Sequence, residues 1–403
     1  MRSSRVLIRP REPAFWVYVA LLGVTAAGTL AQQSSFRRIS PGGWALSWVL
    51  LLLYAAPVFI LIYLLDLYER EPIPLLLASF VWGAIVATQL AGFANAGWGL
   101  VVARVGGPEF ASQWTAALTA PLVEETLKGL GVVLIVLIAR REVDDMMDGF
   151  VYGAVCGLGF AVVEDVFYFI GVFGGSTSDV LRGFFVRVVA SGFYGHVLYT
   201  GLVGMGIGYF VSRRSTVPAR HRFGVLAALC AAAVAGHFLW NSPLVDFYPS
   251  PPWTGVEWLL VVGATSAKGL PLLVFVVVAV ALARGRERRW LRAALAPEVG
   301  GSALSGIELD LLENPARRRR SRREMKLRAG AAAATLLRRL QHEQIRLAVA
   351  RTRADGAEES SDSGGASEVA EQRELCTALR AALLAMPGAM LAGSLEPGRG
   401  SHR

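Results

Sequence analysis

Eight apolar stretches, each long enough to cross a lipid bilayer, constrain the fold of this chain more than any other feature. A helix of about twenty apolar residues spans the hydrocarbon core of a membrane. The stretches cover residues 14–31, 44–65, 75–103, 116–139, 148–173, 188–211, 223–241 and 256–283. Over the whole chain 54% of residues are hydrophobic and only 18% are charged. We therefore predict an all-α fold, a polytopic transmembrane helix bundle of about eight spans.

The sequence changes character after Leu282. Of the formal net charge of +9, residues 284–403 contribute +7, from 22 basic and 15 acidic residues. We expect a basic helical segment over 286–353, then an acidic, Ser/Gly-rich flexible linker and a short terminal helix, 371–384, within 354–403. Together they form a soluble Arg-rich tail. Such basic runs act mostly by nonspecific charge, which favours contact with anionic lipid over a dedicated nucleic-acid module.

Basic residues in the short loops predict the orientation of the spans. They gather before the first span and after the fourth, sixth and eighth spans, which all lie on one side of the membrane. Because basic loops remain inside, both termini are expected in the cytoplasm. Residues 2–31 also have the features of a signal peptide, and cleavage before Gln32 would leave seven spans.

Four consecutive predicted spans carry polar and ionisable side chains that are costly inside a membrane and therefore indicate function. They are Glu124, Glu125 and Lys128 in the fourth span, Glu164 and Asp165 in the fifth, His196 in the sixth, and His237 and Asn241 in the seventh. At 1.5 Å per residue, Glu124, Glu164 and His196 lie about 12 to 13 Å below the outer ends of their helices. His237 lies about 6 Å below the outer end of its helix. We expect these groups to meet in one water-accessible layer, in the outer half of the bilayer.

Spacing within each helix limits which groups can act together. Glu124 and Lys128 are four residues apart in the favourable order for an ion pair, whereas Glu125 points about 100° away. His237 and Asn241 are also four apart and share one face. Two histidines with glutamates suffice for zinc-assisted hydrolysis, and the same groups suit a metal-free route in which a glutamate activates water. The residues leave both routes open.

The ordered motifs resemble those of the PrsW family of intramembrane metalloproteases, in the wider clan of CAAX prenyl endopeptidases. They are DLYEREP from Asp66, EETLK from Glu124, GFAVVED from Gly159, the helix of His196 and HFLWN from His237. The resemblance makes residues 55–285 a protease core, preceded by an N-terminal membrane region, 1–54. It implies a bacterial cytoplasmic-membrane protease that cuts membrane-anchored proteins, commonly regulatory ones such as anti-sigma factors.

The resemblance also assigns roles within this site. Glu124 would be the principal catalytic glutamate, and Glu125 would orient it or pair with Lys128. Glu164, His196 and His237 would hold a metal ion, which the resemblance implies is zinc, and Asn241 would complete the catalytic set with them. Two other classes of function compete with this one: an ion- or proton-coupled transporter, since buried acids and histidines also make relays, and a noncatalytic membrane scaffold. We see no inverted repeat of the kind that transporters ordinarily show.

Overall fold

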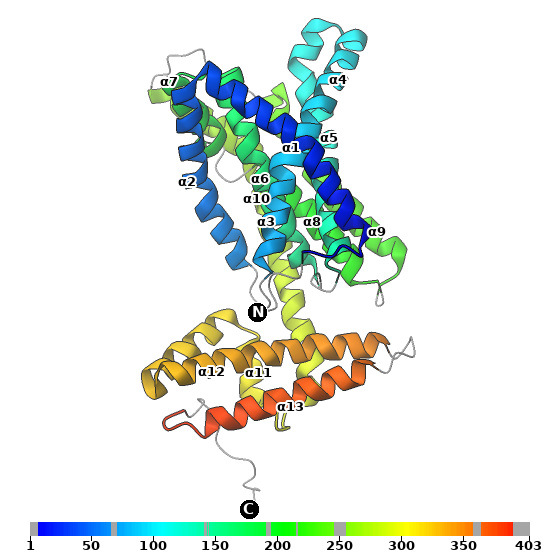
Figure 1. Cartoon of the computed structure of the whole chain (residues 1–403), viewed down its shortest axis with the longest axis vertical. Helices are drawn as coiled ribbons and strands as arrows, with labels where there is room; N and C mark the ends of the chain where they lie inside the picture. The colour runs from blue at the N-terminus through cyan, green and yellow to red at the C-terminus, as the bar shows by residue number, and fades with distance from the viewer. Residues whose placement is uncertain are drawn as a thin grey trace, which may run out of the picture. The chain divides into compact units, whose positions relative to one another are not determined.

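A computed structural model of the chain describes residues 7–65, 71–140, 143, 145–190, 195–214, 217–245, 255–357 and 364–389 (Figure 1). These residues form helices joined by short connections, and the described part of the chain contains no β-strand. The all-α prediction is therefore confirmed. The described residues fall into two compact units, one ending at Val280 and the other beginning at Ala281.

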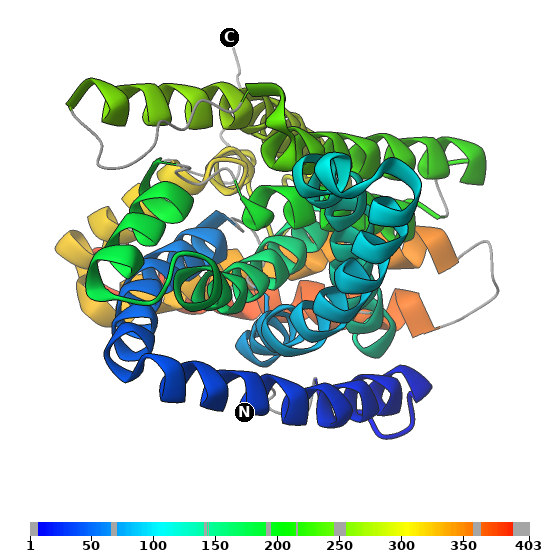
Figure 2. The same ribbon diagram turned by 90° about the horizontal axis from the view of Figure 1, so that it is seen from above.

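Six helical segments of the described residues are long and apolar enough to cross a membrane. They are α1 (Pro13–Ile39), α2 (Pro41–Leu65), Ile73–Gly106 (α3, η1 and α4), Met146–Val172 (α6 and η2), α9 (Ala219–Asn241) and Gly255–Glu298 (α10 and η5). The other two predicted spans correspond to α5 (Pro108–Ile138), which carries three charged residues near its middle, and to the shorter α8 (His196–Ser212). Seen from above, α1 runs along one edge of the first unit (Figure 2).

Helix α6 (Met146–Phe167) is the most buried helix of the first unit and packs closely against α8. The contact depends on glycine, because a Cβ atom at Gly153 would lie 2.1 Å from the carbonyl oxygen of Thr200. A Cβ at Gly149 would likewise lie 2.1 Å from the carbonyl oxygen of Gly204. These two glycines therefore permit close packing of the two helices. Two backbones in such contact hold the residues of α6 and α8 in fixed register.

The sixth predicted span is not one continuous helix. The chain forms α7 (Thr177–Phe184) and a π-helical turn, η3 (Phe185–Ala190), and α8 then begins at His196. Gly195, the residue before α8, has a non-helical backbone (φ −89°, ψ −148°), and glycine is a poor helix former. The expectation that His196 lies about 12 Å inside a helix is therefore wrong. It occupies the first helical position instead.

The second unit is a helical bundle with its own hydrophobic core. It contains the end of α10 (Gly255–Leu295), the short α11 (Gly306–Leu312), α12 (Pro315–Ala357) and α13 (Gly364–Leu384). Leucines, alanines and Cys376 from all four helices form the core. Helix α12 is kinked at Gly330, whose φ of 86° favours glycine. Helix α13 begins at Gly364 rather than at Glu371, so part of the expected flexible linker is helical because its apolar residues pack on this core.

Ion pairs to the buried Glu298 join the helices of this second unit and predict that it loses stability in acid. Arg373 donates to both oxygens of Glu298, at 2.8 Å each, and Arg351 donates to one of them at 2.6 Å. Hydrogen bonds from Arg373, followed by those from Arg351, lower the pKa of Glu298 below its ordinary value. A lowered carboxylate pKa stabilises the fold above the unfolded pKa, about 4.3, and this stabilisation is lost as the pH falls through the folded pKa.

We therefore expect Glu298→Gln to lower the thermal unfolding temperature of this unit at pH 7, with a smaller difference from wild type near pH 4. Thermal unfolding of the full chain in detergent, followed by circular dichroism, measures both. Glu374→Gln, which changes an exposed acid of α13, is the control and should have little effect at either pH. A difference for Glu298→Gln that does not shrink in acid would contradict this account.

Candidate active site

Helices α5, α6, α8 and α9 bring most of the predicted site residues together in the interior of the first unit. Glu124, Glu125 and Lys128 come from α5, Glu164 and Asp165 from α6, His196 from α8 and His237 from α9. All except Glu164 are buried. Buried charged groups persist only when they are paired or bind an ion, so their partners define the chemistry of the site.

His237 is fixed between the two glutamates of α5. Its Nδ1 lies 3.0 Å from Oε1 of Glu125, and its Nε2 lies 3.7 Å from Oε2 of Glu124. Because a carboxylate accepts hydrogen bonds, Nδ1 carries the proton and Nε2 presents its lone pair to Glu124. The ring of Tyr199 stacks on the imidazole, with 4.8 Å between centroids, and limits its rotation.

His196 has a similar arrangement with the other acid. Its Nε2 donates to Oε2 of Glu164 at 2.9 Å, and its Nδ1 lies 3.9 Å from Oε2 of Glu124. Each histidine thus hydrogen-bonds to a carboxylate through one ring nitrogen. The other ring nitrogen of each histidine faces Oε2 of Glu124. Carboxylates that hold histidines in this way are the usual outer partners of metal-binding imidazoles.

Glu124 supplies an oxygen without a hydrogen-bond partner at the centre of this arrangement. Its Oε1 accepts from Nδ2 of Asn95 at 3.0 Å, whereas its Oε2 is buried and has no hydrogen-bond partner among the described residues. One ligand atom from each of Glu124, His196 and His237 lies within 4.8 Å of the others. A carboxylate oxygen and two imidazole nitrogens are ligands of catalytic zinc, so this donor set fits a divalent cation.

Two further predicted site residues, Glu164 and Asn241, have hydrogen-bond partners of their own in the structure. Glu164, one of the predicted metal ligands, has its Oε2 bonded to His196 and to Nη2 of Arg187, at 2.7 Å. Asn241 lies at the end of α9, where its Nδ2 donates to the carbonyl oxygen of Ala116 at 3.3 Å. Of the motif Asp66 to Pro72, residues 66–70 lie outside the described part of the chain, and Glu71 accepts a hydrogen bond from the hydroxyl of Tyr152.

Several residues that support the site were missed by the sequence reasoning. Thr200 donates to Oε2 of Glu125 at 2.9 Å, and its position four residues after His196 could have indicated it. Asn95, on α4 (Thr88–Gly106), is uncharged and therefore does not stand out among the ionisable residues of the predicted spans. Arg187 precedes the sixth predicted span in the sequence, and in the structure it is partly buried within η3. There it pairs with Glu164 and with Oδ1 of Asp165, at 2.5 Å, and lies over the ring of Tyr168.

Arg187 is expected to position Glu164, and through it His196. Replacing it with glutamine leaves two partly or fully buried carboxylates without their cation, which typically costs about 3 to 5 kcal/mol of stability. We expect Arg187→Gln to lower the unfolding temperature, and Asp165→Asn in the same chain to recover part of the loss, because the pair is then removed together. Arg182→Gln, which breaks a more exposed pair with Asp179, is the control. Additive effects of Arg187→Gln and Asp165→Asn would contradict the coupling.

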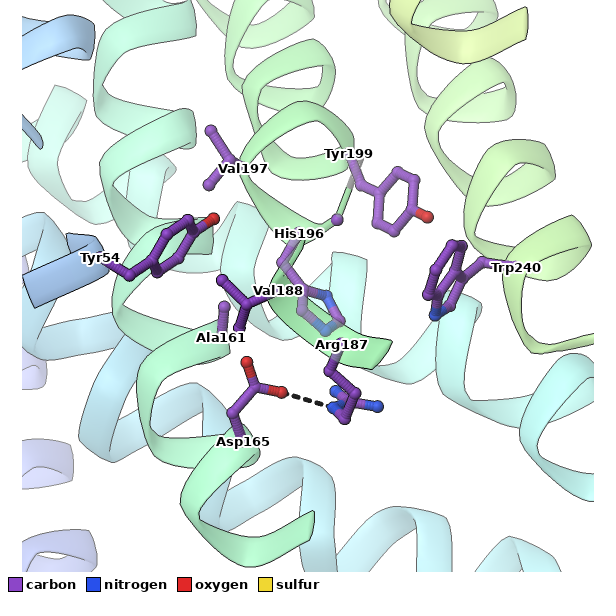
Figure 3. Close-up of a pocket in the computed structure, with 10 residues that line it drawn as sticks. Tyr54, Ala161, Asp165, Arg187, Val188, His196, Val197, Tyr199 and Trp240 are labelled. Carbon is purple, nitrogen blue, oxygen red and sulfur yellow. Dashed lines mark hydrogen bonds and ion pairs between the residues drawn. The ribbon is translucent and has the colours of Figure 1, made fainter. Parts of the chain in front are cut away.

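A pocket beside His196 gives access to one side of the site (Figure 3). Its lining includes Tyr54, Arg187, His196, Tyr199 and Trp240, together with apolar residues of α6, η3 and α8. Figure 3 shows the His196 ring near the bound pair of Arg187 and Asp165. Aromatic and apolar walls with a few polar groups are typical of ligand-binding sites in proteins.

Comparison with known proteins agrees with this geometry. A family model described as PrsW family intramembrane metalloprotease matches residues 71–283, more than half of the chain. The chain belongs to the PrsW family. Glu124, His196, His237 and the residues that hydrogen-bond to them fall within the match, whereas the PrsW family model ends before most of the second unit, at residue 283.

Two curated relatives bear the name Protease PrsW. The protein from Bacillus subtilis (strain 168) is 33% identical over 109 residues, which cover 27% of this chain and 47% of the relative. The protein from Geobacillus kaustophilus (strain HTA426) is 27% identical over 200 residues, which cover 49% of this chain and 72% of the relative. The chain thus spans about half the length of the Bacillus relative that it matches. No solved structure matches the chain.

Proposed function

We propose that this PrsW family member is an intramembrane endopeptidase that hydrolyses a peptide bond of a membrane-anchored protein. The observation that carries the proposal is Oε2 of Glu124, which has no hydrogen-bond partner among the described residues and faces one nitrogen of His196 and one of His237. A buried, unsatisfied carboxylate oxygen costs stability, and active sites are where such a cost is retained. The name of both relatives and the family match support a protease rather than a transporter or a scaffold.

In this proposal Glu124, His196 and His237 would hold a divalent cation, with zinc favoured by the donor set. The chemistry that such an ion supplies is polarisation of the scissile carbonyl and a lower pKa for bound water. Glu124 replaces Glu164 in the set that we first expected, because Oε2 of Glu164 already accepts two hydrogen bonds. Glu164 and Glu125 would then hold the two imidazoles in the required tautomers and orientations.

The protein groups have complementary tasks in hydrolysis. In the metal-free route, where Glu124 is not a ligand, its carboxylate lies within a few ångströms of both imidazoles and can receive a proton from the attacking water. Tyr199 and Thr200 restrain His237 and Glu125, so the constellation is held before substrate binds. Asn241 remains a candidate for stabilising developing charge on the substrate oxygen, provided that its side chain leaves the carbonyl of Ala116.

The surroundings of the site support a membrane-embedded substrate. The site lies within a unit of apolar helices, and aromatic and apolar residues line the pocket beside His196 together with the pair of Arg187 and Asp165. We further propose that the protein lies in the cytoplasmic membrane of a bacterium, with both termini inside and the site in the outer half of the bilayer. Anionic lipid is the proposed contact of the Arg-rich tail. A regulatory protein such as an anti-sigma factor is the proposed type of substrate.

A reconstituted cleavage assay tests this function. The full chain is placed in liposomes with a panel of single-pass reporter proteins, before and after chelation and after zinc is restored. We expect cleavage within or near the transmembrane segment of at least one reporter, loss on chelation and recovery with zinc. Cleavage that survives chelation would favour the metal-free route at the same residues. If a folded protein cuts no member of a broad panel, the transporter and scaffold hypotheses gain.

A further inference from the structure

Lys128 is a fully buried cation inside the proposed metal site. Its Nζ lies 2.5 Å from Oε1 of Glu125, 2.9 Å from Nδ1 of His196 and 3.8 Å from Oε2 of Glu124. It also lies 4.3 Å from the centre of the Phe160 ring. A lysine at this depth must be paired, and two of its neighbours belong to the proposed ligand set.

The hydrogen bonds of His196 show which of its atoms the lysine occupies. Its Nε2 faces a carboxylate oxygen of Glu164, which can only accept, so Nε2 carries the proton. Its Nδ1 therefore has a free lone pair, and the ammonium of Lys128, which can only donate, is bonded to that lone pair. This is the same nitrogen that is turned toward Glu124. A metal ion and the ammonium cannot both bind it.

We propose that the Lys128 ammonium occupies the cation site formed by Glu124, His196 and His237, and that a divalent cation must displace it from His196 to bind. The inference rests on the proposed function, because it concerns the same site. Glu125 provides the place to which the displaced ammonium can go. Its Oε1 is the shortest contact of Nζ, and its carboxylate is held by Thr200 and His237. The lysine side chain is long and flexible enough to leave Nδ1 while it keeps this contact.

Competition with Lys128 has two physical components, both of which weaken metal binding. The ammonium covers one ligand nitrogen, and it places a positive charge a few ångströms from the incoming cation in a medium of low dielectric constant. Removing the lysine charge should therefore tighten binding by at least about tenfold. A lysine that served only to neutralise the glutamates from a distance would not cover Nδ1.

The test is the zinc affinity of the purified full chain in detergent, measured by competition with a chromophoric chelator. We expect Lys128→Met to bind zinc at least about tenfold more tightly than wild type, and Lys128→Arg to bind no more tightly. Lys268→Met is the matched control. Lys268 is the other buried lysine of the membrane unit, it donates to the carbonyls of Trp240 and Ser242, and its loss should leave the affinity unchanged.

A second pair of variants guards against loss of folding. Lys128→Met leaves Glu125 without its cation. The double variant Lys128→Met with Glu125→Gln is therefore compared with Glu125→Gln alone. Unfolding temperatures are measured for all variants. Tighter binding in the double variant supports the proposal. Equal zinc affinity with and without Lys128 overturns it and leaves the metal site in place. If neither wild type nor any lysine variant binds zinc, both this inference and the metal-dependent form of the proposed function fail. Zinc binding that is seen only after the lysine is removed supports the inference.

Discussion

Replacing Glu124 with glutamine is expected to reduce cleavage of a membrane-anchored reporter by at least about a hundredfold, in the range typical for loss of a catalytic acid or base. Glutamine has nearly the same shape, and its carbonyl oxygen can still accept the hydrogen bond of Asn95. Its amide nitrogen, however, would replace Oε2, the oxygen that faces the two histidines. An amide can neither take a proton from water nor serve as an anionic ligand. Single-turnover cleavage in liposomes measures the effect.

Two comparisons separate this chemical effect from misfolding. Glu109→Gln changes an exposed acid in the first turn of the same helix and should leave cleavage unchanged. The unfolding temperature of Glu124→Gln should stay close to that of wild type or rise, because a buried, incompletely paired charge is removed. If a folded Glu124→Gln protein cuts at the wild-type rate, the centre that we propose around Oε2 is wrong.

The residues of the site could be predicted from the sequence because charged groups are rare in membrane helices. Glu124, Glu164, His196 and His237 each stood out against an apolar background on successive spans, and the structure brings them together. Their pairing could not be predicted. Spacing favoured an ion pair between Glu124 and Lys128, yet Lys128 lies closer to Glu125, at 2.5 Å against 3.8 Å. Side-chain conformations and contacts between helices distant in sequence determine which glutamate pairs with Lys128. The helical spacing of residues in the sequence gives no information on either.

The helices followed the apolar pattern well, and the exceptions have physical causes. Hydropathy cannot distinguish a continuous span from one interrupted near one end, so the apolar pattern does not show that α8 begins at His196. The tail shows a different limit. Its mixed basic and acidic composition suggested an appendage, but alanine and leucine at helical spacing on α12 and α13 form a core between helices distant in sequence. Composition alone does not reveal that these faces meet.

Gly157→Ala is expected to reduce cleavage by about a hundredfold although the residue touches no catalytic atom. A Cβ at this position of α6 would lie 2.1 Å from the carbonyl oxygen of His196 and 2.6 Å from its carbonyl carbon. Both are backbone atoms at the beginning of α8, so the helix start must move outward by more than an ångström. The imidazole would then lose its hydrogen bond to Glu164, now 2.9 Å, and its alignment with Glu124. Overpacking also typically costs about 1 to 3 kcal/mol of stability.

The matched control for this variant is Gly97→Ala in α4, where an added Cβ meets nothing within 4 Å. That change should leave cleavage unaltered and should stabilise the helix slightly, because alanine favours helical backbone over glycine. Restoring room on the partner helix is not possible at Gly157, since the obstructing atoms belong to the backbone of His196 rather than to a side chain. Cleavage by Gly157→Ala at the wild-type rate would therefore mean that His196 can move by more than an ångström without consequence. In that case the imidazole is not part of a preorganised centre, and its place in the proposed ligand set is lost with it.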